Sequence, residues 1–172
     1  MTIENIAIVN RCLKAEYEKV NAPVMDLVAA QTQDPFRILV GTILSARTKD
    51  ETTAAACRKL FAKAATAAAL QRLSVKELED LIFPVGFYRT KARHLAQLPQ
   101  ALDDEFCGKI PNTVEELCSL PGVGRKTANL VVALGFGLPA ICVDVHVHRI
   151  CNRLGLVKTE TPHDTEMELR KI

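Results

Sequence analysis

The ten residues from Leu120 to Asn129 constrain this chain more than any other segment. They read Leu-Pro-Gly-Val-Gly-Arg-Lys-Thr-Ala-Asn and lead into an apolar helical pattern. Glycine at Gly122 and Gly124 allows positive φ and removes side chains that would keep a large anion away from the backbone N–H groups. The start of a helix adds N–H groups without intrahelical partners and the positive end of its dipole. The segment therefore predicts a turn that receives a phosphate of a nucleic-acid backbone, although a plain turn or helix cap has the same local pattern.

A second informative segment begins at Gly135. The residues Gly-Phe-Gly-Leu-Pro break the helical pattern at 135–139, and an apolar run then leads into Asp144. A new helical pattern starts at Val145, which makes Asp144 an N-cap, where its carboxylate accepts backbone hydrogen bonds. Most aspartates at such a position are only caps, so the pattern alone leaves open whether Asp144 also has a chemical role.

Taken together, the two segments resemble the helix-hairpin-helix and the following Gly/Pro-rich loop with aspartate of the helix-hairpin-helix-GPD superfamily of DNA-repair glycosylases. The residues from Val143 to Arg153 are most similar to the endonuclease III family. Lys126 stands where the bifunctional members keep their nucleophile. The resemblance thus implies a DNA glycosylase and AP lyase of base-excision repair that removes oxidised pyrimidines and nicks abasic sites by β-elimination.

The resemblance also assigns roles to individual residues. Lys126 would attack C1′ of the damaged nucleotide and form a Schiff base, and the carboxylate of Asp144 would stabilise the cationic sugar and help to move protons. The implied DNA contacts are Gly122, Val123, Gly124, Arg125, Arg47, Phe87, His146 and Arg149.

Two of these residues would act where the damaged nucleotide leaves the base stack. Arg47 stands where many relatives carry a gap-filling glutamine, and Phe87 stands where they carry an apolar wedge. A surface charge and a core aromatic remain equally good interpretations of the two residues. His146 and His148 are two apart on the expected helix and face different ways, so they are poor partners for a metal ion.

Two other functions remain open. A non-catalytic helix-hairpin-helix protein would use the turn only to bind DNA, and a monofunctional mismatch glycosylase would remove a base without cutting the strand. Lys126 argues against both of these functions, because each of them works without a lysine nucleophile.

The net charge of +2, from 22 basic and 20 acidic residues among 172, argues only weakly for a nucleic-acid partner. Basic residues do gather locally: Arg125 with Lys126, Arg149 with Arg153, and a third group of Arg89, Lys91 and Arg93. The partner expected from the resemblance is damaged double-stranded DNA, bound by a monomer.

The six cysteines form no CxxC pair and no spacing typical of zinc or of an iron–sulfur cluster. We interpret them as reduced, mostly buried thiols, so we expect no metal and no cofactor in this chain. The endonuclease III family ends in four cysteines that bind a 4Fe-4S cluster, and this sequence has no such segment. A truncated chain is the favoured interpretation, and a naturally shortened homologue is the alternative.

Neither a secretory signal near Met1 nor a membrane-spanning run is recognisable in the sequence. The sequence therefore predicts a cytoplasmic protein with no membrane partner.

Helical periodicity dominates the chain, so the predicted fold is all-α. The pattern predicts an amphipathic helix from Ile3 to Val20 and a buried helix after Asp34-Pro35. It also predicts a helical alanine-rich segment over 54–69 and a helix over 88–106 that kinks or ends at Pro99. Capping boxes are expected at Thr48 with Glu51, at Ser74 with Glu77 and at Thr113 with Glu116. Another helix is expected to begin at Thr161-Pro162, with Met167 and Ile172 on its apolar face.

The family resemblance divides these helices into two lobes with a DNA-binding cleft between them. One lobe comprises 22–137, with the hairpin at about 118–128. The other comprises 1–21 plus 138–172 and is incomplete at its C-terminal end.

Overall fold

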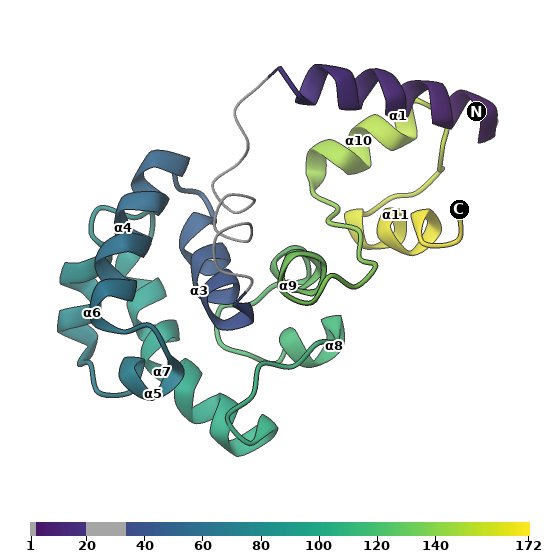
Figure 1. Ribbon diagram of the computed structural model, residues 1–172. Coiled ribbons are helices and arrows are strands. Elements are labelled where there is room, and N and C mark those ends of the chain that lie inside the picture. The colour runs from purple at the N-terminus through teal and green to yellow at the C-terminus, as the bar shows by residue number, and fades with distance from the viewer. Residues whose placement is uncertain (1–2, 20–33) are drawn as a thin grey trace. The chain divides into compact units, whose positions relative to one another are not determined.

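The fold is all-helical, as the sequence predicted. The structure is a computed structural model that describes residues 3–19 and 34–172. These residues include no strand (Figure 1). The chain divides into two compact units, Pro23–Ala140 and Met1–Ala22 with Ile141–Ile172. The lobe boundaries expected near residues 22 and 137 stay a prediction, since the first of them lies outside the described residues.

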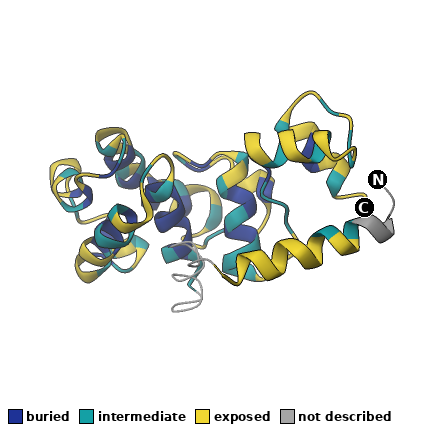
Figure 2. Ribbon diagram, turned by 90° about the horizontal axis from the view of Figure 1, so that it is seen from above, coloured by how far each residue is buried: buried dark blue, intermediate teal, exposed yellow. Residues whose placement is uncertain are grey.

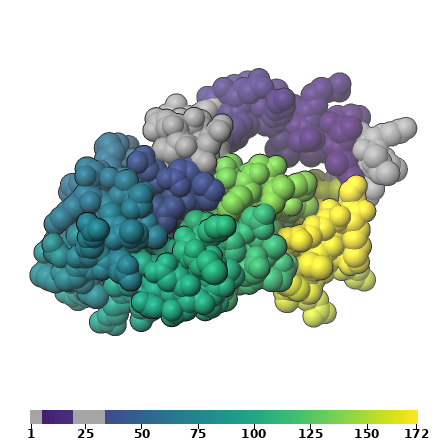
Figure 3. All heavy atoms as spheres, turned by 60° about the horizontal axis from the view of Figure 1, so that its bottom comes forward, coloured from purple at the N-terminus to yellow at the C-terminus, as the bar shows by residue number. Residues whose placement is uncertain are grey.

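The unit Pro23–Ala140 holds the apolar core. The buried cluster extends from Phe36 to Val132, all within this unit. In the space-filling view, the blue to green segments of the unit pack closely side by side (Figure 3). Its helices are α3 (Pro35–Ser45), α4 (Asp50–Lys63), α5 (Ala67–Leu70), α6 (Val75–Ile82), α7 (Tyr88–Phe106), α8 (Val114–Leu117) and α9 (Arg125–Phe136).

The central helix of this unit is α3, which packs against α4, α7 and α9. The Asp34 carboxylate accepts a hydrogen bond of 2.9 Å from the backbone N–H of Phe36, and Pro35 occupies the first turn. This start confirms the predicted cap. The helix is apolar nearly all round, and eight of its eleven residues are buried: Phe36, Ile38, Leu39, Val40, Gly41, Thr42, Ile43 and Leu44.

Helix α7 does not end at Pro99, so this part of the prediction was wrong. It continues to Phe106, with Pro99 itself buried. Leu95, Leu98 and Leu102 lie on one face of the helix and are fully buried. Because this apolar face extends to both sides of Pro99, burial offsets the missing backbone hydrogen bond.

The predicted helix starts had mixed outcomes. Ser74 and Glu77 form the expected capping box of α6, and the Thr113 hydroxyl accepts from the backbone N–H of Glu116 at the start of α8. Thr48 does not cap α4, because the N-cap is Lys49 and the Thr48 hydroxyl is used in long-range contacts. The alanine-rich segment is not one helix either. It is interrupted after Lys63, and Thr66 caps the short α5 through the N–H of Ala69.

The second unit contains α1 (Ile3–Tyr17), α10 (Val145–Arg153) and α11 (Pro162–Leu169). Helices α10 and α11 pack against each other. Thr161 caps α11 by accepting from the backbone N–H of Asp164 at 3.1 Å, as predicted. That helix ends at Leu169, and Met167 and Ile172 are exposed.

Helix α1 exposes most of its length (Figure 2). Its apolar residues Ile8, Leu13 and Tyr17 are all exposed. Val20, the last residue of the predicted amphipathic pattern, lies outside the described residues. Within 3–19 and 34–172, no helix combines the length and the apolar character that crossing a membrane requires.

Candidate functional site

The predicted hairpin turn lies between α8 and α9. Gly122 has a φ of +77°, a conformation that a residue with a Cβ rarely adopts. A Cβ built on Gly122 would also lie 2.5 Å from Nδ1 of His94 on α7, so this turn packs directly on that helix. Val123 is buried beneath the turn.

Gly124 differs from the prediction in its backbone conformation. Its φ is −95°, because it is the extended N-cap residue of α9. A Cβ at Gly124 would meet no atom within 4 Å, so the turn is open at this position. The helix start and this open surface are together what a phosphate contact requires.

Lys126 is the second residue of α9 and is exposed. Arg125 precedes it and lies 3.6 Å from the carboxylate of Glu115 on α8. This ion pair connects the two helices on either side of the turn. The structure thus brings five predicted residues, 122–126, into one turn and the first turn of one helix.

Asp144 caps α10. One oxygen of its carboxylate accepts from the backbone N–H groups of His146 at 2.9 Å and Val147 at 3.0 Å, which confirms the predicted cap. His146 and Arg149 are exposed on the same helix, 3.4 Å apart at Nδ1 and a guanidinium nitrogen. Asp144 and Lys126 belong to different compact units, and each is placed by its own helix start.

A polar network supports α10 below this exposed face. Asn152 donates to the carbonyl oxygen of His148 at 2.9 Å and accepts from the backbone N–H of Thr159 at 2.9 Å. Nδ1 of His148 lies 2.6 Å from the hydroxyl of Thr165, which is buried. His148 is therefore held by hydrogen bonds within its own unit.

Arg47 and Phe87 form a pair in the unit Pro23–Ala140. The guanidinium carbon of Arg47 lies 5.7 Å from the centroid of the Phe87 ring, within cation–π distance. Both residues have left-handed backbones, with φ of 53° and 55°. The Phe87 side chain is 63% exposed, so the interpretation of Phe87 as a core residue was wrong.

Lys91 does not belong to an exposed basic group with Arg89 and Arg93, as the sequence suggested. Only 7% of it is exposed, and its ammonium donates to the carbonyl oxygens of Leu44 and Ala46 at 2.8 and 2.6 Å. Burial lowers the pKa of Lys91 to about 8. A signal was present in the sequence, because Lys91 continues the spacing of the buried leucines Leu95 and Leu98 along α7.

The cysteines are less buried than predicted. Only Cys57 is buried, and burial raises the pKa of its thiol to about 11, whereas Cys12, Cys107 and Cys118 are exposed. Nowhere in the described part of the chain do three or more His, Cys, Asp or Glu residues lie close enough to hold a metal ion. The cysteines of the described residues therefore do not fit the 4Fe-4S cluster that the family resemblance implies. The absence of a cofactor stays a prediction.

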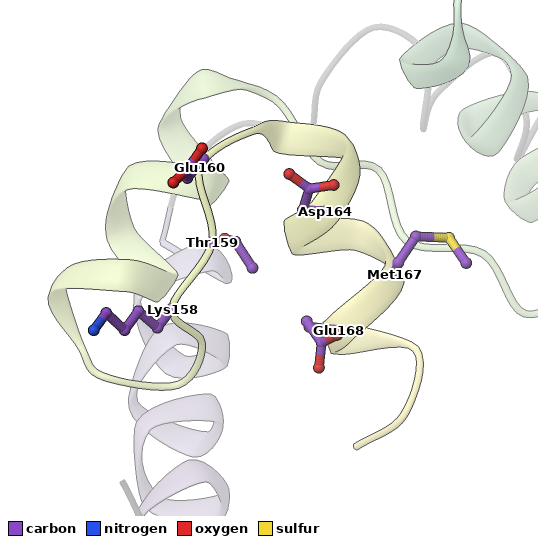
Figure 4. Close-up of a pocket in the computed structure, with 6 residues that line it drawn as sticks. All are labelled: Lys158, Thr159, Glu160, Asp164, Met167 and Glu168. Carbon is purple, nitrogen blue, oxygen red and sulfur yellow. The ribbon is translucent and has the colours of Figure 1, made fainter.

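A shallow pocket lies beside α11 in the second unit, as Figure 4 shows. Three carboxylates contribute to its lining, together with Lys158, Thr159 and Met167. The Lys158 side chain extends away from Asp164 and Met167 (Figure 4). The pocket holds none of the predicted site residues.

Comparison with known proteins places these features in a family. Residues 40–172 match the model of the HhH-GPD superfamily base excision DNA repair protein, which covers the hairpin, the Asp144 cap and the Arg47–Phe87 pair. The chain belongs to this superfamily. The prediction made from residues 120–129 and 143–153 is confirmed.

Individual relatives agree with this assignment. Endonuclease III of Thermotoga maritima is 50% identical over 139 residues, which are 81% of this chain and 65% of that protein. The chain therefore spans less than two thirds of that relative's length.

Two solved structures have the same fold. A non-covalent endonuclease III–DNA complex is 34% identical with a TM-score of 0.84, over 100% of this chain and 78% of the other. A trapped endonuclease III–DNA covalent intermediate, with an estranged adenine, is 41% identical with a TM-score of 0.75. That match covers 81% of this chain and 66% of the other.

Proposed function

We propose that this chain is a bifunctional DNA glycosylase and AP lyase of base-excision repair that acts on oxidised pyrimidines in double-stranded DNA. The observation that carries the proposal is an exposed lysine, Lys126, in the first turn of the helix behind a glycine turn, in a chain of the HhH-GPD superfamily. The similarity to a trapped endonuclease III–DNA covalent intermediate supports a covalent mechanism.

In this mechanism the neutral amine of Lys126 forms a bond to C1′ while the bond from C1′ to the base breaks, and the departing base takes up a proton. The amine nitrogen then gives up a proton, and the bond from C1′ to the ring oxygen breaks while that oxygen takes up a proton. The opened ring is a protonated imine, which acidifies the protons on C2′. Loss of one C2′ proton expels the 3′ phosphate and cuts the strand. The carboxylate of Asp144 would stabilise the cationic sugar, a role that rests on the family resemblance.

The hairpin would contribute binding without sequence preference. Gly122 lets the turn lie on α7, and Gly124 leaves the helix start open to a phosphate oxygen. Exposed Arg149 and His146 of α10 would add contacts from the second unit. A contact to a phosphate carries no base information, so lesion preference must come from other residues.

Arg47 and Phe87 are the residues that we propose for lesion preference. An exposed aromatic ring can enter the stack beside the extruded nucleotide, and a guanidinium with five N–H donors can bond to the base left behind. Their cation–π contact presents them as a pair. The protein would act as a monomer.

Borohydride trapping on a duplex with one abasic site tests the proposed reaction. Borohydride reduces a Schiff base to a stable amine, so the parent protein should give a covalent protein–DNA band. Lys126→Gln should give no band while keeping its affinity for DNA. The matched control, Lys109→Gln, removes another exposed lysine of the same unit and should trap like the parent. A folded parent that binds DNA but never traps would favour the non-catalytic DNA-binding alternative.

Gly124→Val tests the hairpin separately. The new side chain enters open space, so the fold should be retained. Affinity should fall equally for damaged and undamaged duplexes, and the slope of log affinity against log salt should become shallower by about one unit. An unchanged affinity and slope in the folded variant would contradict the phosphate contact.

A further inference from the structure

The ammonium of Lys91 lies at the point where two loops meet. It donates to the carbonyl oxygens of Leu44 and Ala46, at the end of α3, and to the hydroxyl of Thr48 at 3.2 Å. An ammonium has three donors, so these three acceptors satisfy it completely. The loop over 46–49, which carries Arg47, is thereby bound to α7.

The loop that carries Phe87 is bound to the same point. The backbone N–H of Gly86 donates to the Thr48 hydroxyl at 3.1 Å. A Cβ on Gly86 would lie 2.4 Å from the carbonyl oxygen of Arg47, so the two loops touch backbone to backbone. The N–H of Lys91 also bonds to the carbonyl oxygen of Phe87 at 3.1 Å, in the first turn of α7.

These contacts hold two residues in an unusual conformation. Arg47 and Phe87 both have positive φ, which disfavours residues with a Cβ and persists only where the surroundings fix it. Their side chains meet outside the loops, at the cation–π distance of 5.7 Å. The geometry of the pair therefore depends on how the loops are joined beneath it.

We infer that Lys91 is a positioning residue for lesion recognition. Its ammonium binds the loop over 46–49 to α7 and holds the Thr48 hydroxyl, which in turn accepts from Gly86 in the loop over 83–87, and Arg47 and Phe87 are thereby presented as one pair. This inference rests on the proposed function, since it assigns a cause to the geometry of the residues proposed for lesion preference. A methionine of similar length could fill the space without burying a charge, so what the ammonium adds is its hydrogen bonds.

Lys91→Met tests the inference directly, with Lys76→Met as the matched control. Lys76 lies on α6 in the same unit with 75% of its side chain exposed. The measured quantity is lesion preference, the ratio of the dissociation constants for an undamaged duplex and for one with a tetrahydrofuran abasic analogue. Lys91→Met should lower this ratio by up to about 100-fold, because a misplacement of about 1 Å can cost that much. Its affinity for the undamaged duplex should stay within about twofold of the parent's, because the hairpin is unchanged.

A spectroscopic measurement separates positioning from general stability. With 2-aminopurine opposite the abasic analogue, stacking by an inserted side chain changes the fluorescence when the parent binds. Lys91→Met should lose this change at saturating protein, and Lys76→Met should retain it. If Lys91→Met does not fold, Thr48→Val takes its place in the test. This variant removes the shared hydroxyl and keeps Lys91, and it should also lower lesion preference.

A double-mutant cycle decides whether Lys91 acts through the pair. If it does, Lys91→Met should reduce lesion preference by less than about twofold in an Arg47→Ala, Phe87→Ala background. The inference would be overturned if Lys91→Met reduced lesion preference by the same factor in that background as in the parent. A folded Lys91→Met protein with the parent's lesion preference and fluorescence change would also overturn it. A parent that shows no lesion preference would instead count against the proposed function.

Discussion

Helix α7 in the unit Pro23–Ala140 buries Leu95, Leu98 and Leu102 completely, whereas α10 in the other unit has no buried residue. The buried apolar cluster belongs to the first unit, and Val143 is the one buried apolar residue among the described part of the second. The second unit relies instead on hydrogen bonds among Asn152, Thr159 and Thr165.

This difference matters for the proposed chemistry. The hairpin and the Arg47–Phe87 pair depend on loops held against a packed core, so their geometry is sensitive to the packing of the whole unit. Asp144 is placed by two hydrogen bonds to the first turn of its own helix. Its chemical role should therefore be separable from stability.

The largest expected effect is a loss of turnover in Asp144→Asn. Asparagine caps a helix about as well as aspartate, so the melting temperature should hardly change. Without the negative charge, single-turnover cleavage of a damaged duplex should slow by about 10²- to 10⁴-fold. The control Asp164→Asn changes a carboxylate in the first turn of α11, where Thr161 is the cap, and should leave turnover intact. Normal turnover in Asp144→Asn would mean that Asp144 acts only as a helix cap.

Truncations of apolar residues test the contrast between the two units. Leu95→Ala opens a cavity in the core and should lower the free energy of unfolding by about 2–5 kcal/mol. Ile150→Ala on α10 truncates a residue that is 48% exposed. It should change the free energy of unfolding by no more than about 0.5 kcal/mol. Urea denaturation followed by circular dichroism measures both. Equal losses of unfolding free energy in the two variants would contradict the exposed position of Ile150.

The polar network of the second unit should make a moderate contribution. Asn152→Ala removes two donated hydrogen bonds and leaves the backbone N–H of Thr159 without its acceptor. The expected loss is about 1–3 kcal/mol. Asn152→Asp keeps the acceptor and should lose less. If both variants match the parent in thermal denaturation, the network does not stabilise this unit.

The smallest effect is the acid dependence of one capping carboxylate. Hydrogen bonds from the backbone and side chain of Ser74, followed by Lys63, lower the pKa of Glu77 to about 2. Folded protein then binds fewer protons than unfolded protein, so this stabilisation is complete above pH 4.5 and is lost as pH falls towards 2. Glu77→Gln should flatten the dependence of unfolding free energy on pH within that window. An identical slope in parent and variant would contradict the assigned cause.

Much of the fold could be predicted because its signals are local. The starts of α3, α6, α10 and α11 each depend on a side chain two or three residues from the N–H group that it caps. The burial of α3 followed from its apolar composition. The turn at Gly122 followed from a ten-residue motif.

The rest depended on contacts between distant residues. Thr48 has a capping sequence, yet its hydroxyl bonds to Gly86 and Lys91, which lie 38 and 43 residues away. Pro99 breaks a helix locally, but burial on both sides of it keeps α7 continuous. A single sequence does not show where a tertiary contact overrides a local preference in this way. Lys91 is an exception, because its place in the leucine spacing of α7 indicates that it is buried.

The most direct test of the proposed lysine nucleophile is to find the atom that joins protein to DNA. The borohydride-trapped complex with an abasic duplex can be digested with nuclease and trypsin, and the peptide that carries the sugar remnant can be sequenced by mass spectrometry. We expect the remnant on Nζ of Lys126. A remnant on any other lysine or on the N-terminal amine, or a folded, DNA-binding protein with no remnant at all, would contradict it.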